Sequence, residues 1–262
     1  MTSAAIRLRQ PLAALWRAEG VLQVGLAEPV VIEPVPAAAQ QLVELLATPH
    51  TRGQLIDRLP AMSPEWIDWL CGQLEHAGLL VGPPIPVAEV AIWGTGPLAQ
   101  RLLTRLIACG LPASRLSPEA VGSLHRGRLV VLAGEQCEPD RALTTQLTRA
   151  QQSHLVVRLE PERAVVGPLV VPGDSSCVRC SDLQLCAHDD AWPRLLAQLC
   201  AQRTTPDPLL LDWATTTAVT QIAAWSDRRR PEVQGRTLEL GRAELRLRAR
   251  TIPIHPDCGC LS

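Results

Sequence analysis

The sequence predicts a two-part α/β protein, with a small winged-helix-like module followed by a larger Rossmann-like α/β domain. Three observations lead to this prediction. Short β-like runs and amphipathic helices follow one another within residues 1–82, a proline-rich stretch occupies 83–86, and a glycine turn between a buried strand and a helix opens the remainder, 87–262. The 262 residues suffice for two domains with cores of their own. We therefore expect the proline-rich stretch to be the linker between them.

The composition excludes several classes of protein. Apolar residues make up 47% of the chain and the formal net charge is −1, so the sequence is neither disordered nor basic. All 25 basic residues are arginine, which excludes mechanisms that need a lysine, such as a Schiff base or a P-loop lysine. Neither a secretory signal nor a run of about 18 apolar residues is visible. We therefore expect a cytoplasmic protein without a membrane or nucleic-acid partner.

The N-terminal third is predicted to hold two strands followed by three helices. The β-like runs cover 21–26 and 30–35, Thr51 caps the second helix, and Ser63 caps the third, which ends near Gly78. This order is typical of a winged helix, and many winged helices bind DNA. Residues 1–85 carry five arginines against eight acidic residues, however, whereas a protein that reads a DNA groove is normally basic. The charge balance thus disfavours a winged-helix regulator, which stays an alternative.

The strand pair, the helical segments Gln41–Leu46 and Thr51–Leu55, and the end of the third helix at Leu74–Leu80 resemble the PqqD-like module, also called the RiPP recognition element. Members of that family bind the leader part of a ribosomally made precursor peptide. The resemblance implies that a leader adds as a strand to the sheet edge and packs against the third helix. The implied contacts are Val30, Ile32, Trp66, Trp69 and Leu70. Trp66 and Leu70, four residues apart on one helix face, can instead both be core residues.

A glycine turn joins a buried strand to a helix at the start of the second part. Gly94, Gly96 and Ala99 form a GxGxxA fingerprint in the strand–turn–helix context of a dinucleotide-binding fold. Further buried strands at 128–134 and 154–159 indicate an open α/β sheet.

The fingerprint lacks two features of a nucleotide site. A dinucleotide site places an acidic residue about 20 residues after the glycines, to hold the ribose. The acid in 107–126 is Glu119, which lies in a polar stretch rather than at the end of a strand, and Pro97 removes a backbone N–H from the turn. We therefore expect the glycines to serve the strand–helix geometry and expect no bound ATP; a nucleotide in the loop is the alternative.

Two close cysteine pairs stand out among the nine cysteines. Cys177 and Cys180 form CxxC, and Cys258 and Cys260 form CxC. Close thiol pairs far apart in the sequence are typical of a closed, structural zinc site with four sulfur ligands. We therefore expect Zn²⁺ bound by these four residues and no open catalytic position.

The cysteines have alternative roles. Cys186 or His255 can replace one of the four ligands, and CxxC can be a redox pair. We expect no redox role, because no strand–CxxC–helix pattern of the thioredoxin type is predicted around the motif. Beyond CxxC, we expect a loop at 187–205 with a helix from Asp190, a helix at 209–225, and a hairpin over 236–250. The hairpin has an arginine-rich face that is either solvated or meets an acidic partner.

The glycine loop, the segment Gly167–Asp182 and the segment His255–Cys260 together resemble the ThiF-like fold of ubiquitin-activating-type adenylating enzymes. More narrowly, they are similar to the ThiF-like cyclodehydratase proteins of bacteriocin (TOMM) gene clusters, which join a PqqD-like module to a degenerate ThiF-like domain. Those proteins bind the leader and present it to a YcaO partner, which uses ATP to cyclise Cys, Ser or Thr into azolines.

The resemblance implies a non-catalytic, leader-binding subunit of a cyclodehydratase complex. Adenylating members of the wider family use a lysine and an acid around ATP. This chain contains no lysine, so the resemblance extends to the fold, the zinc site and leader binding. ATP-dependent adenylation of a carboxylate is the alternative activity.

Overall fold

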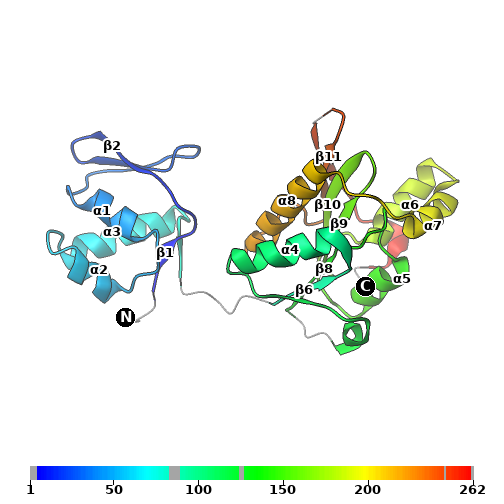
Figure 1. The fold of residues 1–262 in the computed structure, drawn as a ribbon. Helices are drawn as coiled ribbons and strands as arrows, with labels where there is room; N and C mark the ends of the chain where they lie inside the picture. Colours follow the sequence, from blue (N-terminus) through cyan, green and yellow to red (C-terminus); the bar gives the residue numbers. More distant parts are fainter. Residues whose placement is uncertain (1–4, 83–88, 124–126, 245, 261–262) are drawn as a thin grey trace. The chain divides into compact units, whose positions relative to one another are not determined.

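A computed structural model describes residues 5–82, 89–123, 127–244 and 246–260 (Figure 1). The chain forms two compact units, Met1–Pro86 and Val87–Ser262. The linker expected at 83–86 lies outside the described residues. Among the residues that are described, no helix combines the length and hydrophobicity needed to cross a membrane.

The N-terminal unit is built on an antiparallel sheet of β2 (Ala14–Ala18), β3 (Val21–Val24) and β4 (Val30–Ile32). The strand order is β2-β3-β4, so β2 and β4 are both edge strands. A second, two-stranded sheet pairs β1 (Arg7–Leu8) with β5 (Leu80–Val81). The two predicted strands correspond to β3 and β4, whereas β2 was not predicted.

Three helices complete this unit: α1 (Ala39–Leu45), α2 (Arg52–Arg58) and α3 (Pro64–His76). Both predicted caps are confirmed. Thr51 closes a capping box on α2, and the Ser63 side chain accepts from the first turn of α3. The helices and the sheet share one core, to which the buried side chains of Leu22, Val24, Ile32, Leu42, Leu55, Ile67, Leu70 and Leu74 belong.

The C-terminal unit holds one seven-stranded mixed sheet. Its strands are β6 (Val90–Trp93), β7 (Ala113–Arg115), β8 (Leu129–Leu132), β9 (His154–Leu159), β10 (Arg163–Val170), β11 (Arg236–Gly241) and β12 (Leu247–Thr251). The order is β12-β11-β10-β9-β8-β6-β7. The strands from β7 to β9 run parallel and those from β9 to β12 antiparallel, which confirms the predicted α/β class.

Helices cover both faces of this sheet (Figure 1). On one face, α4 (Gly96–Ala108) packs against α8 (Pro208–Ser226), and both share the larger core with the strands. On the other face lie α5 (Arg141–Arg149) and α6 (Val178–His188), and α7 (Trp192–Ala201) contacts α6. This second face carries the cysteine pairs.

The helix expected from Asp190 is confirmed as α7, which begins at Trp192, and α6 extends into the expected loop as far as His188. The prediction that no strand and helix flank the CxxC motif was wrong, because the motif lies between a strand, β10, and a helix, α6. Neither element was predicted, because Gly167 and Pro168 within β10 are typical turn residues and α6 has almost no amphipathic periodicity. The predicted helix at 209–225 and the predicted hairpin are confirmed as α8 and β11–β12.

Candidate metal centre and peptide-binding edge

The four predicted cysteines lie together in the C-terminal unit. The Sγ atoms of Cys177, Cys180, Cys258 and Cys260 all lie within 4.8 Å of one another. Three of the separations are 3.9 Å (Cys177–Cys180), 3.4 Å (Cys177–Cys258) and 3.5 Å (Cys180–Cys260). A tetrahedral zinc ion with Zn–S bonds of about 2.3 Å separates its sulfurs by about 3.8 Å. The cluster therefore has the spacing of a site for one metal ion with four sulfur ligands.

The local backbone structure directs the sulfurs of each cysteine pair toward the other pair. Cys177 is the N-cap of α6 and Cys180 lies in its first turn, so both sulfurs sit at the positive end of that helix. In the second pair, Cys258 is the last residue of a short 3₁₀ turn, Pro256–Cys258, and Cys260 follows it. Gly259 then has φ of 68°, in the left-handed region that glycine tolerates, and this turn brings Cys260 back toward Cys180.

The electrostatics of the cluster favour a bound cation. Burial opposes ionisation of Cys180, but N–H groups that donate to its sulfur, including that of His255 at 3.4 Å, lower its pKa below the ordinary value. Burial and the adjacent Cys180 sulfur raise the pKa of Cys260 to about 11, and burial with the adjacent Cys177 and Cys180 sulfurs raises the pKa of Cys258 further. Four thiolates this close repel one another, and a divalent cation removes that repulsion.

The two alternative ligands, Cys186 and His255, do not join the cluster through their side chains. Cys186 is absent from the group of four. His255 contributes its backbone N–H to Cys180, while its ring Nδ1 accepts from the backbone N–H of Asp257 at 3.2 Å. The structure therefore brings together the four sulfurs that the spacing predicted.

The glycine turn has the predicted strand–turn–helix geometry. Gly94 and Gly96 have φ values of 126° and 85°, and Ala99 is buried in the core under α4. A side chain at Gly94 would lie 2.3 Å from the carbonyl oxygen of Ala133. Position 94 therefore requires glycine, because the turn lies directly against the backbone at the end of β8. This requirement holds whether or not a ligand binds.

Two side chains differ from what a nucleotide site needs: an acidic residue lies where a phosphate would bind, and an arginine lies where an acid would hold the ribose. A Cβ atom on Gly96, the first residue of α4, would lie 2.6 Å from Oε1 of Glu135. The Glu135 carboxylate therefore lies at the N-terminus of this helix. A helix N-terminus after a glycine turn is where phosphate binds in such folds. Arg115 stands at the end of β7, the place of the ribose acid, and donates to the Gly94 carbonyl at 3.0 Å and to Gln100 at 2.6 Å. Neither contact was predicted, because each depends on where another strand ends.

The backbone of Val31 on edge strand β4 faces away from the sheet. The N–H of Gly25, which directly follows β3, donates to the carbonyl of Ala13 at 2.8 Å, on the β2 side. Backbone groups along an antiparallel strand alternate between its two sides, so Gln23 also faces β2. Val31 lies opposite Gln23. Its N–H and C=O therefore point outward, into the position that an added strand would take.

Of the five expected peptide contacts, the structure leaves three with accessible side chains. Trp66 and Trp69 are each 37% exposed on α3, with ring centroids 5.3 Å apart in an edge-to-face pair. Val30 is half-buried. Ile32 and Leu70 were wrongly included, because both side chains are buried in the module's own core. On the same strand as Val30, the side chain of Val31 is exposed but was not among the expected contacts.

The comparisons with known proteins identify the fold. No protein-family model matches this sequence, and no curated protein matches it either. Among solved structures, the heterocyclase TruD matches 99% of the chain with a TM-score of 0.68 and 18% identity. A heterocyclase in complex with substrate and cofactor matches 99% of the chain with a TM-score of 0.73 and 17% identity. E. coli MccB with ATP matches 98% of the chain with a TM-score of 0.58 and 11% identity.

This chain has the ThiF-like and MccB-like α/β fold. At these identities the likeness establishes the architecture and leaves the activity open. The chain spans 43% and 40% of the two heterocyclases, but it matches the whole length of MccB.

Proposed function

We propose that this chain binds the leader of a ribosomally made precursor peptide and presents it to a YcaO-type cyclodehydratase, which forms azolines. The observation that carries the proposal is the outward-facing backbone of Val31 on a free strand edge, in a module that also exposes Trp66 and Trp69. Main-chain pairing supplies affinity in strand addition, and pockets for alternate side chains supply selectivity.

The C-terminal unit has a supporting role in this proposal. We assign one structural Zn²⁺ to Cys177, Cys180, Cys258 and Cys260, which fit a closed tetrahedral site. The two heterocyclase neighbours are more than twice as long as this chain. In this proposal the cyclising chemistry belongs to the YcaO-type partner.

ATP-dependent adenylation is the second candidate, because MccB, which has been solved with ATP, matches along its whole length. Three features speak against it. Glu135 places negative charge where a phosphate would bind, Arg115 replaces the ribose acid, and the chain has no lysine. We therefore propose the non-catalytic role.

The test is a calorimetric titration of the full chain with the unmodified precursor peptide encoded beside its gene. We expect a dissociation constant near micromolar, about −8 kcal/mol, because ordering the peptide offsets part of the interaction. Val31→Pro removes the outward N–H and should weaken binding about 10-fold, whereas Val31→Ala keeps that N–H and should change it little.

Trp16→Pro on the opposite edge strand, β2, is the matched control. It removes an edge N–H of the same kind and should leave peptide affinity unchanged. Absence of binding to the folded wild-type chain, or equal weakening by all three variants, contradicts strand addition at β4. Binding of DNA in place of the peptide would favour the regulator alternative.

A further inference from the structure

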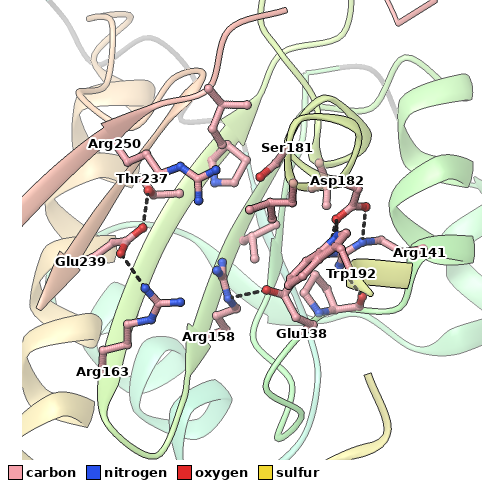
Figure 2. A pocket seen from close by; sticks show the side chains of 16 residues that line it. Glu138, Arg141, Arg158, Arg163, Ser181, Asp182, Trp192, Thr237, Glu239 and Arg250 are labelled. Carbon is pink, nitrogen blue, oxygen red and sulfur yellow. Dashed lines mark hydrogen bonds and ion pairs between the residues drawn. The ribbon is translucent and has the colours of Figure 1, made fainter. Parts of the chain in front are cut away.

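A polar cavity of about 110 Å³ lies in the C-terminal unit between α6, α7 and the antiparallel strands (Figure 2). It is separate from the cysteine cluster and from the glycine turn. Its walls carry an unusual density of charge, contributed by Glu138, Arg141, Arg158, Arg163, Asp182, Glu239 and Arg250.

The carboxylates on the α6 side are already neutralised. Asp182 accepts two hydrogen bonds from Arg141, at 2.7 and 2.9 Å, and a third from the indole of Trp192 at 3.3 Å. Glu138 accepts from Arg141 at 2.9 Å and pairs with Arg158 at 3.1 Å.

The same holds on the strand side. Glu239 accepts from Arg163 at 3.0 Å and from the Thr237 hydroxyl at 2.9 Å. Glu160, at the end of β9, accepts from Arg163 at 2.7 Å and from Arg158 Nε at 3.3 Å. Every wall carboxylate therefore has at least two donors.

Several donors in the cavity have no such partner. Within the described part of the chain, the Arg250 side chain makes no hydrogen bond or ion pair, and the Ser181 hydroxyl makes no hydrogen bond. Arg158 reaches Glu160 and Glu138 through Nε, and among the described residues its two Nη groups donate no hydrogen bond. Figure 2 shows the Arg158 and Arg250 guanidinium groups and the Ser181 hydroxyl directed toward the same space.

We propose that this cavity is a binding site for a small oxyanion, a carboxylate or a phosphate group, held by Arg158, Arg250 and Ser181. A guanidinium presents parallel N–H donors that match two oxygens of such a group, and Ser181 adds a neutral donor. The volume is several times the roughly 30 Å³ that a water molecule occupies, which suits a group of a few heavy atoms.

The other arginines of the wall are held in ion pairs with acidic residues. Among the described lining residues, Arg250 is the one cation without such a pair. Arg250 lies on β12, an edge strand whose residues are all exposed. The site is therefore reachable both by a free anion and by an acidic side chain or carboxyl terminus of a peptide.

The test compares inorganic phosphate and sodium acetate, each titrated into the full chain at constant ionic strength with chloride as the reference. We expect saturable heat and a rise in unfolding temperature with at least one of the two. Phosphate alone would assign a phosphate group as the ligand, and acetate alone would assign a peptide carboxylate.

Arg250→Ala should weaken that binding about 10-fold or more, and Ser181→Ala about threefold. The control is Arg105→Ala, which removes one exposed positive charge from the last turn of α4, away from the cavity. Lack of saturable binding of both anions to the wild type overturns the proposal. Equal weakening by Arg250→Ala and Arg105→Ala also overturns it, because it would reflect net charge alone.

Discussion

The hydroxyl of Ser176 donates a 2.6 Å hydrogen bond to the carbonyl oxygen of Ile252, and both residues are buried. Ser176 directly precedes the CxxC pair, and Ile252 leads into the segment that carries the CxC pair. Gln184 on α6 adds a second such bond, to the carbonyl of Pro253 at 2.6 Å. These contacts join the two segments through protein groups alone.

The zinc assignment predicts one zinc per chain and its loss on Cys258→Ser. Because binding to a structural site contributes directly to folding, we expect a loss of about 3 kcal/mol, which corresponds to roughly 6–12 °C in unfolding temperature. Metal analysis under reducing conditions with thermal unfolding measures both. Cys109→Ser, an exposed cysteine outside the cluster, should retain the metal. A wild-type chain purified without zinc would contradict the assignment.

Adjacent residues on α3 should separate peptide binding from stability. Trp69→Ala removes an exposed indole and should weaken leader binding by about 2–4 kcal/mol, with little change in unfolding free energy. Leu70→Ala empties a fully buried position and should lower stability by about 2–5 kcal/mol. Calorimetry and denaturant unfolding of both variants give the comparison. If Trp69→Ala lowers stability without affecting binding, the indole is part of the scaffold.

The glycine turn should not support adenylation. We expect no exchange of pyrophosphate into ATP by the chain with its precursor peptide, because Glu135 occupies the anion position beside Gly96. The measurement is the exchange rate over a protein-free control. An exchange rate above background that Gly96→Val abolishes would restore the adenylation alternative.

Stability should fall in mild acid because of His154. This histidine is buried in β9, and burial lowers its pKa to about 4 from the ordinary 6.5, although a contact with the Gln152 carbonyl opposes the shift. The unfolded chain therefore binds the extra proton first, between pH 6.5 and 4. We expect a loss of about 2 kcal/mol from pH 7 to pH 5. His154→Asn should flatten that slope in denaturant unfolding, and an unchanged slope would assign the acid sensitivity elsewhere.

Features set by local sequence were predictable. The helix caps at Thr51 and Ser63 and the turn glycines depend on residues close in the chain. The cysteine spacing pointed to four sulfurs, and the structure brings those four together.

Features set by pairing between distant segments were not predictable. Strand β2, the position of Glu135 and the charged cavity under α6 each depend on which segments become neighbours. Ile32 and Leu70 were misjudged for a related reason. An apolar residue at a sheet edge or on a helix has the same sequence pattern whether it faces the core or a ligand.

The most direct test of leader binding at β4 is amide hydrogen exchange of Val31 in the full chain, with and without the unmodified precursor peptide. Without peptide, the Val31 amide faces solvent and should exchange rapidly, whereas the Gln23 amide faces β2 and should be protected. Saturating peptide should slow exchange at Val31 about 10-fold or more and leave Gln23 unchanged. A peptide that binds while the Val31 rate stays the same would contradict strand addition at this edge.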